Sequence, residues 1–290
     1  HNMKVALIGN TYQAEKSRYL MTIIEQLRKH GVKIIVERHF LAFITSELGF
    51  ATNDMEAFDE CEFVADLCIS IGGDGTFLKA ASYVESKQIP ILGINTGNLG
   101  FLADVLPDEI EEACECICRG EFIVESRGVI EVRRNGQLFS QHPYALNEVA
   151  VLKHDNSSLI GIEAKIDGGL LNHYMADGLI ITTPTGSTGY SLSVGGPILT
   201  PMSGTLCLSP VASHSLNTRP VVVTDNVCIE MRVESRSHNY LIAIDGRSES
   251  LPCTDLITVT KAPFKIGVAK IKRKNFYDTL REKMAWGRRG

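Results

Sequence analysis

The 290-residue sequence predicts two domains, an α/β domain with a parallel sheet followed by an all-β, sandwich-like domain. Up to residue 121, short apolar runs alternate with segments of helical spacing, which is typical of a parallel sheet covered on both faces. From residue 122, helical spacing nearly vanishes and short strand-like runs follow one another between polar turns. The last segment returns to helical spacing.

The first domain is expected to contain four strands and four helices. Strands are expected at Lys4–Gly9, Val32–Val36, Leu67–Ile71 and Ile89–Ile94. Helices are expected at Thr11–His30, His39–Leu48, Lys79–Ser86 and Pro107–Arg119. The polar stretch Thr52–Glu62 is assigned no element. Because strands and helices alternate, we predict a Rossmann-like parallel sheet.

The second half is expected to form short strands at Ile123–Val132, Leu159–Ile166, Val221–Val223, Val227–Val233, Leu241–Ile244 and Leu256–Lys261. The segment Asn275–Trp286 then places Phe276, Leu280 and Met284 on one helical face. A lone helix needs a partner surface for such a face, so we expect it to pack on the first domain. The predicted domains are therefore 3–121 with 272–290, and 122–271.

The composition favours a globular protein over a nucleic-acid or membrane protein. Hydrophobic residues make up 44% and charged residues 22%, and the formal net charge is −5. A nucleic-acid partner usually needs a basic face, and no apolar run is long enough to cross a bilayer. No basic-then-apolar signal pattern begins the sequence, so we expect a cytoplasmic location.

The eight cysteines are expected to be reduced thiols that pack as small hydrophobes. Cys114, Cys116 and Cys118 are close in sequence, but helical spacing places Cys116 off the face shared by the other two. No second Cys/His pair stands nearby at a zinc-like spacing. We therefore predict no protein-held metal at these cysteines.

The stretch Leu67–Ala81 (LCISIGGDGTFLKAA) is the strongest functional signal. A strand that ends in glycines and opens a helix presents N–H groups and a positive dipole end to an anion. Asp74 is a poor phosphate ligand by itself, but it suits a hydroxyl or a metal beside a phosphate. This predicts phosphoryl transfer with Asp74 as the chemical residue. The alternative is an ordinary Gly/Asp turn.

A second loop, Asn95–Phe101 (NTGNLGF), also follows a strand of the first domain. Ligands of parallel sheets bind beyond the carboxyl ends of the strands, which is where both loops are expected. The alternative for this loop is a plain turn.

Two motifs in the second half carry unusual polar residues. Asn147 and Glu148 interrupt an apolar segment and could bind ribose hydroxyls or a base edge, although a turn or an exposed strand edge is the slightly favoured alternative. Asp177–Ser193 (DGLIITTPTGSTGYSLS) combines an Asp-Gly turn, a strand and a loop rich in hydroxyls and glycines. Tyr190 offers a ring for stacking on a base. Asp245-Gly246-Arg247 resembles a hairpin turn, and it could equally place an acid at a subunit contact.

These motifs, in this order, resemble the NAD kinase family. They are GGDGT at 72–76, NE at 147–148, DG at 177–178, TPTGSTGY at 183–190, GGP at 195–197, HSL…RP at 214–220 and DG at 245–246. The first motif alone also resembles diacylglycerol kinases, sphingosine kinases and phosphofructokinases. The TPTGST motif with NE upstream is far more specific, and the resemblance covers nearly the whole chain.

The resemblance implies transfer of a phosphoryl group from ATP or polyphosphate to the adenosine-ribose 2′-hydroxyl of NAD, giving NADP. It also implies a divalent metal, normally Mg²⁺, and a homodimer or homotetramer. Asp74 would be the proton acceptor. Phosphate or dinucleotide contacts would come from Gly72, Gly73, Gly75, Thr76, Lys79, Phe101, Asn147, Glu148, Asp177, Thr185, Thr188, Gly189, Tyr190, Ser191, Leu192, Ser193, Ala212, Asp245 and Arg247.

Three positions depart from the family pattern. Gly189 stands where alanine is usual, and Ser213 replaces a common proline. Met175 stands where many members carry arginine, which leaves the preference between NAD and NADH open.

Two other functions remain as alternatives. A lipid kinase would share the glycine motif, but no membrane-seeking amphipathic stretch is present. A non-catalytic NADP sensor would share the whole pattern, although the intact Asp74 favours an enzyme.

Overall fold

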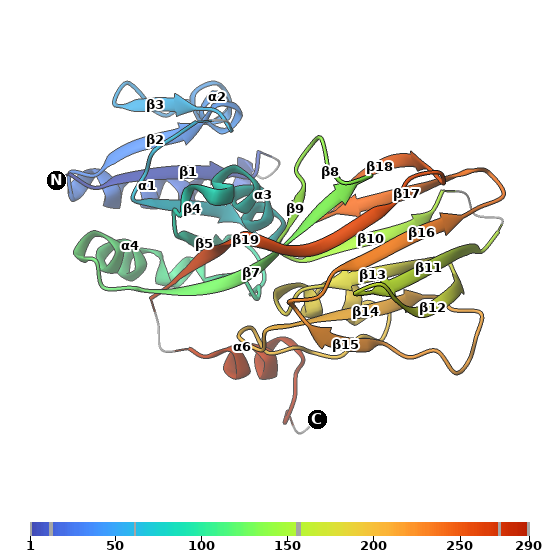
Figure 1. Cartoon of the computed structure of the whole chain (residues 1–290). Coiled ribbons are helices and arrows are strands. Elements are labelled where there is room, and N and C mark those ends of the chain that lie inside the picture. The colour runs from blue at the N-terminus through green and yellow to red at the C-terminus, as the bar shows by residue number, and fades with distance from the viewer. Residues whose placement is uncertain (1, 12–13, 61, 155–157, 272–273, 289–290) are drawn as a thin grey trace. The chain divides into compact units, whose positions relative to one another are not determined.

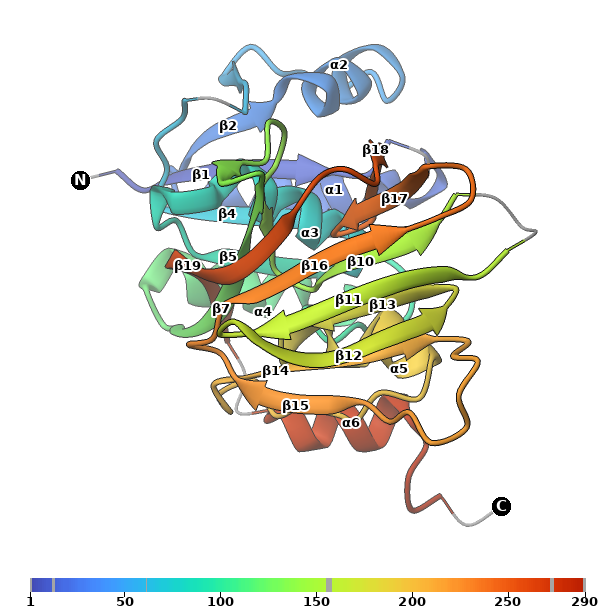
Figure 2. The same ribbon diagram turned by 45° about the vertical axis from the view of Figure 1, so that its right-hand side comes forward.

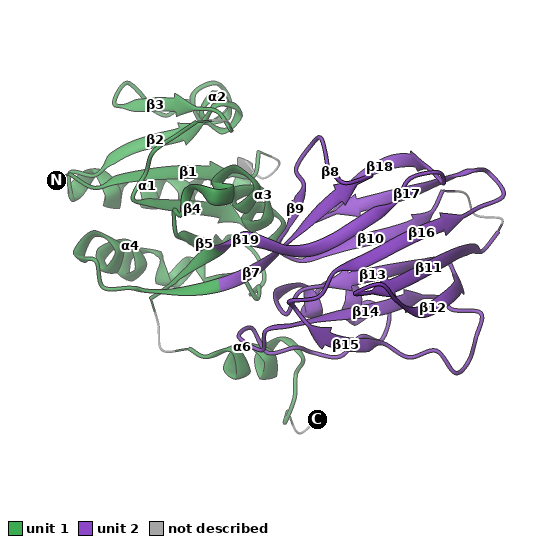
Figure 3. Ribbon diagram, in the orientation of Figure 1, with its two compact units in different colours: residues 1–126, 266–290 green, residues 127–265 purple. Residues whose placement is uncertain are grey.

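The computed structural model describes residues 2–11, 14–60, 62–154, 158–271 and 274–288. The chain forms two compact units (Figure 3): unit 1 comprises His1–Ser126 and Ile266–Gly290, and unit 2 comprises Arg127–Lys265. The domain limits expected at residues 121 and 272 lie several residues from this division. The difference arises because one strand at each crossing, 123–134 and 257–270, begins in one unit and ends in the other.

Unit 1 contains a parallel sheet with the strand order β5-β4-β1-β2-β3 (Figure 1). The strands are β1 (Lys4–Gly9), β2 (Lys33–Glu37), β3 (Met55–Phe58), β4 (Leu67–Gly72) and β5 (Ile91–Asn95), with β6 (Ala103–Val105) beside β5. Consecutive residues of β1, from Val5 to Ile8, are all fully buried. Since neighbouring side chains point to opposite faces, both faces of the sheet are covered, as the sequence predicts.

The helices of unit 1 lie at the predicted segments, but the third begins at Asp74, five residues before the expected start at Lys79. They are α1 (Ser17–Lys29), α2 (Arg38–Ser46), α3 (Asp74–Val84), α4 (Ile110–Arg119) and α6 (Phe276–Lys283), with 3₁₀ turns η1 (Ala14–Lys16), η2 (Glu85–Lys87) and η3 (Pro107–Glu109). α6 begins with a capping box in which the side chains of Asn275 and Asp278 each accept the other's backbone N–H. The rings of Phe276 and Phe101 lie 6.0 Å apart between centroids, within unit 1.

Unit 2 is a sandwich of antiparallel strands, which confirms the predicted fold class. One sheet has the order β15-β14-β13-β10-β17-β18, and the other contains β12-β11-β16-β19 (Figure 2). The strands are β7 (Ile123–Arg134), β8 (Gln137–Leu138), β9 (Tyr144–Ala145), β10 (Glu148–Lys153), β11 (Ile160–Ile166), β12 (Gly169–Ala176), β13 (Gly178–Thr182), β14 (Thr205–Val211), β15 (Val221–Thr224), β16 (Ile229–Glu234), β17 (Asn239–Ile244), β18 (Arg247–Pro252) and β19 (Ile257–Lys270). Buried residues of both sheets, such as Val151 and Met231, belong to one core.

The sequence-based prediction missed several strands and assigned one helical segment as a loop. β3 lies in the polar stretch 52–62 because only its two end residues are buried, which hides the periodicity of a strand. Edge strand β12 has the same problem, since most of its side chains are exposed or half-buried. The expected loop 184–189 is largely helical, with η4 (Thr185–Thr188) followed by α5 (Tyr190–Ser193).

Among the described residues, no helix is long and apolar enough to cross a membrane.

Candidate active site

Asp74 is the first residue of α3, directly after the glycines that end β4. Its Oδ1 accepts the backbone N–H groups of Leu102 (3.1 Å) and Ala103 (2.8 Å), and its Oδ2 accepts the N–H of Phe101 (3.0 Å). A carboxylate offers about four lone-pair sites, so Oδ2 retains capacity for one further donor. The carboxylate is therefore held in place by the backbone and can still accept a proton or a hydroxyl hydrogen bond.

Gly100 makes room for this carboxylate. A Cβ at position 100 would lie 2.1 Å from Asp74 Oδ1, so no side chain fits there while Asp74 keeps its place. The sequence analysis did not single out Gly100, although the residue belongs to the NTGNLGF loop. Its importance comes from a contact between residues that are far apart in the sequence.

Asp74 faces a cavity of about 400 Å³ in unit 1. Its lining residues are Asn10, Lys16, Gly72, Gly73, Asp74, Gly75, Thr76, Asn95, Thr96, Gly97, Asn98, Leu99, Gly100 and Lys283. Of these described residues, Asp74 carries the only carboxylate, and Lys16 and Lys283 are the cations. No side chain caps the start of α3, and a Cβ at Gly73 or Gly75 would meet nothing within 4 Å. The helix N-terminus is therefore open to a ligand.

Lys79, the cation expected from the sequence, is not among the residues that line the cavity. Its Nζ lies 3.9 Å from Glu37 Oε2 and 5.9 Å from the centre of the Tyr83 ring. Glu37 is almost fully buried at the end of β2 and accepts the Phe40 N–H at 2.9 Å. Burial raises the pKa of Glu37, but hydrogen bonds from His39 and Phe40 and the charge of Lys79 outweigh it, so the pKa lies below its usual value. The attraction of this buried carboxylate explains the direction that Lys79 takes.

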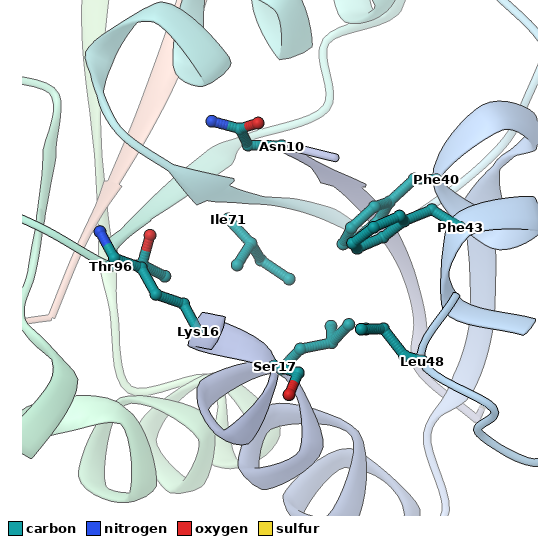
Figure 4. A pocket seen from close by; sticks show the side chains of 9 residues that line it. Asn10, Lys16, Ser17, Phe40, Phe43, Leu48, Ile71 and Thr96 are labelled. Atoms are coloured by element: carbon teal, nitrogen blue, oxygen red, sulfur yellow. The ribbon is translucent and has the colours of Figure 1, made fainter. Parts of the chain in front are cut away.

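A smaller hollow lies beside the cavity and shares Asn10, Lys16 and Thr96 with it (Figure 4). Phe40, Phe43 and other apolar side chains form the rest of its wall. Its free volume is about 30 Å³, which holds a water molecule or two but not a purine ring. We assign no ligand to it.

In unit 2, Asp245 holds the turn that carries Asn147 and Glu148. Its carboxylate accepts the N–H groups of Leu146 (2.7 Å), Asn147 (2.8 Å) and Glu148 (3.1 Å). Asp245 and Gly246 have φ angles of +48° and +83° between β17 and β18, which confirms the predicted hairpin turn. Asp245, one of the site residues expected from the sequence, therefore contacts the NE motif and fixes the position of its backbone.

Glu148 is a buried carboxyl with an unusual pKa. Burial and the neighbouring charge of Asp245 raise the pKa of Glu148 to about 7, although the Tyr190 N–H, 3.3 Å from Oε1, acts in the opposite direction. Burial also raises the pKa of Asp245, against the effect of its three N–H donors and Arg247. Asn147 Oδ1 is buried without a hydrogen-bond partner among the described residues, so it is an acceptor left for a ligand.

The TPTGST segment packs directly against this turn. A Cβ at Gly186 would lie 2.2 Å from the Asn147 carbonyl oxygen, so the close approach requires glycine. Arg127, a buried residue that the sequence analysis missed, donates from Nη1 to Thr185 Oγ1 at 3.0 Å.

Most hydroxyls of the 183–193 segment are engaged within the protein rather than facing a ligand. Thr188 donates to the Thr185 carbonyl, Ser193 donates to the Tyr190 carbonyl, and the Ser191 hydroxyl lies 3.3 Å from that of Ser209. Tyr190 is 40% exposed and Gly189 is exposed, whereas Leu192 is half-buried. The exposed residues of the segment are therefore the Gly189-Tyr190 corner and Ser193.

Asp177 directly precedes β13 and Ala212 directly follows β14, so both lie at the end of these strands that is far from the NE turn. β10 pairs with β13 so that Glu148 opposes Thr182 and Leu152 opposes Gly178. Four residues along a strand span roughly 14 Å, so Asp177 is far from Glu148 within one chain. Asp177 forms an ion pair with Lys153 at 3.0 Å, and Met175, on β12, is half exposed. The expected residues of unit 2 thus form two groups rather than one.

Three of the seven described cysteines, Cys68, Cys114 and Cys207, are buried as predicted, and the other four are half-buried. Cys114 is buried in the core of unit 1, and burial raises the pKa of its thiol to about 12. Cys61 lies outside the described residues. Within the described ranges, no three His, Cys, Asp or Glu side chains gather as metal ligands would.

The cavity combines an acid at an open helix N-terminus with glycines and two cations. It lies beyond the carboxyl ends of parallel strands. These features are typical of a phosphate-binding α/β protein. The comparison with protein families is more specific. The model of the ATP-NAD kinase N-terminal domain matches residues 5–122, and that of the ATP-NAD kinase C-terminal domain matches residues 146–271.

Individual proteins agree with the family models. An NAD kinase of Bacteroides fragilis is 53% identical over 285 residues, and one of Porphyromonas gingivalis is 40% identical over 284 residues. Both alignments cover 98% of this chain and 98% of the other protein. The chain therefore belongs to the ATP-NAD kinase family.

Solved structures support the fold. Yeast NADH kinase in complex with NADH has a TM-score of 0.90 at 21% identity, covering 100% of this chain and 89% of that one. An NAD kinase from Archaeoglobus fulgidus in complex with ATP has a TM-score of 0.75 at 26% identity, covering 98% and 100%.

Proposed function

We propose that this protein is an NAD kinase, which transfers a phosphoryl group from ATP to the 2′-hydroxyl of the adenosine ribose of NAD and so makes NADP. Family membership over nearly the whole chain supports the reaction. The observation that carries the mechanism is the Asp74 carboxylate, held by three backbone N–H groups at the edge of a glycine-lined cavity.

In this mechanism Asp74 acts as the general base. The ribose 2′-oxygen attacks the γ-phosphorus, the bond from that phosphorus to the ADP oxygen breaks, and the hydroxyl proton passes to Asp74 Oδ2. A positioned base of this kind contributes about 10²–10⁴-fold in rate. The N–H groups of Gly75 and Thr76 and the dipole of α3 stabilise charge on the phosphates.

The donor set of the cavity fits Mg²⁺ that arrives with ATP. One carboxylate with amide oxygens from Asn10 and Asn95 is too few ligands for a complete protein site. Mg²⁺ is commonly held by one or two carboxylates together with substrate phosphates and water. When bound, it neutralises charge on the transferred group. We therefore propose that the donor phosphates and water hold most of the Mg²⁺ coordination, because the one free position on the Asp74 carboxylate is needed for the ribose hydroxyl.

In unit 2, the NE turn and the Gly189-Tyr190 corner are the proposed NAD contacts. The unpartnered Asn147 Oδ1 and the Glu148 carboxyl suit ribose hydroxyls, and the exposed Tyr190 ring suits a base. Asp245 supports this turn from behind, and Thr185 joins it to Arg127.

Asp177 and Ala212 lie far from the NE turn, so a role for them in NAD binding needs a different explanation. The homodimer or homotetramer that the resemblance implies supplies one, because a second copy can present its own Asp177 to an NAD bound at the NE turn. The oligomer stays a prediction until it is measured by light scattering.

The direct test is NADP formation by the purified protein with NAD, ATP and Mg²⁺. Parallel reactions contain NADH in place of NAD, polyphosphate in place of ATP, and EDTA. Product in the first reaction that is abolished by EDTA supports the proposal, and the NADH reaction settles the preference raised by Met175. Binding of NADP without turnover under any condition favours the sensor and contradicts the proposal.

A further inference from the structure

The C-terminal helix α6 contributes a cation to the cavity that contains Asp74. Lys283, the last residue of α6, lines this cavity together with the glycines of the 72–76 turn. Its Nζ lies 5.7 Å from the centre of the Phe101 ring. Phe101 is also the residue whose N–H binds Asp74 Oδ2. One residue thus contacts both the proposed base and the cation.

Lys283 has no carboxylate partner in the part of the chain that the structure describes, and neither does Lys16 on the same cavity. Other lysines of unit 1 do have such partners: Lys33 with Glu56, Lys79 with Glu37, Lys270 with Asp104 and Lys274 with Glu282. Two unpaired cations and a single carboxylate give this cavity an excess of positive charge. An anion of high charge is the ligand that such a wall favours.

α6 is built to hold its last turn in place. Its start has the capping box described above, Thr279 and Leu280 are buried, and Phe276 packs against Phe101. Lys274 also forms an ion pair with Glu282 at 2.8 Å, which ties the segment before the helix to its last turn. Lys283 is therefore carried by an anchored element, although its own side chain is exposed.

We propose that Lys283 binds the phosphate chain of the phosphoryl donor, so that α6 is a functional part of the donor site. The proposal rests on the function proposed above and assigns to the donor a residue from the end of the chain. The ligand class is an inorganic or nucleoside triphosphate. Lys16, near the N-terminal end of the sequence, provides the second cation.

The test compares Lys283→Met and Lys283→Arg with Lys274→Met. The control variant loses the ion pair with Glu282 but keeps every lysine that lines the cavity. Binding of MgATP and of inorganic triphosphate is measured by calorimetry without NAD, and steady-state kinetics give KM for ATP and for NAD. Lys283→Met should weaken binding of both triphosphates and raise KM for ATP about tenfold, with KM for NAD unchanged.

Lys283→Arg should retain most of the affinity, and Lys274→Met should lose far less affinity than Lys283→Met. Wild-type triphosphate affinity in Lys283→Met would overturn the proposal. An equal loss in Lys274→Met would also overturn it, because the effect would then come from a loosened helix. If the wild type fails to phosphorylate NAD but Lys283→Met still loses triphosphate binding, the proposed reaction fails while the binding role of Lys283 stands.

Discussion

At the scale of single residues, the chemistry depends on how the Asp74 carboxylate is held. Three N–H donors from residues 101–103 fix both oxygens, and Gly100 leaves the space that they need. The sequence predicts that Asp74 is a site residue, because a strand, glycines and a helix in succession are local signals. It does not predict the donors, which lie 27 to 29 residues away.

Asp74→Asn should retain NAD binding and lose most turnover, by about 10²–10⁴-fold, since an amide cannot take the ribose proton. Calorimetry with NAD and a coupled NADP assay measure the two quantities. Near-normal turnover in this variant would remove Asp74 from the role of base.

Gly100→Ala should lower turnover strongly while the fold remains. The added Cβ would lie 2.1 Å from Asp74 Oδ1, so the carboxylate must move or the 100–103 loop must shift. Gly128→Ala is the matched control, because a Cβ there meets nothing within 4 Å. Kinetics and thermal unfolding of both variants check this, and equal activity in the two would show that the position of Asp74 is not critical.

At the scale of elements, the β17–β18 hairpin supports the start of β10. The sequence predicts the hairpin turn from Asp245-Gly246, but not that Asp245 caps residues 97 to 99 positions away. It also cannot predict that Glu148 is buried beside Asp245, because this depends on the pairing of β10 with the distant strand β17.

The raised pKa of Glu148 predicts a pH-dependent stability. The unfolded chain releases this proton near pH 4.5 and the folded protein near pH 7, so the folded state binds more protons between these values. The free energy of unfolding therefore falls as pH rises from about 4.5 to above 7, by up to roughly 3 kcal/mol. Urea unfolding at several pH values should show that Glu148→Gln loses this fall, whereas Glu249→Gln on the exposed part of β18 keeps it.

Asp245→Asn should shift the fall in stability to lower pH, because it removes one of the two causes of the raised Glu148 pKa. It should also destabilise the protein by about 1–3 kcal/mol, since an amide NH₂ cannot accept all three N–H groups. The same urea series measures both effects. An unchanged midpoint would show that burial alone raises the pKa of Glu148.

At the scale of the whole molecule, the separation of Asp177 from the NE turn predicts complementation between copies. Asp74→Asn and Asp177→Ala should each be nearly inactive alone, whereas co-expressed chains should regain turnover in mixed oligomers. Separately tagged chains, purified through both tags, allow the measurement. Activity of the mixture no higher than that of the single variants would place both residues in the site of one copy.

The sequence alone determined the fold class, the GGDGT turn and the family, because periodicity, turn chemistry and motif order are properties of neighbouring residues. The tertiary structure decided the surroundings of each functional group. It joined residues 100–103 to Asp74, directed Lys79 to Glu37, placed Lys16 and Lys283 on the cavity, and set Asp177 apart from Glu148. These outcomes depend on which distant segments pack together, and the free energy of that packing is distributed over the whole core rather than encoded in any local pattern.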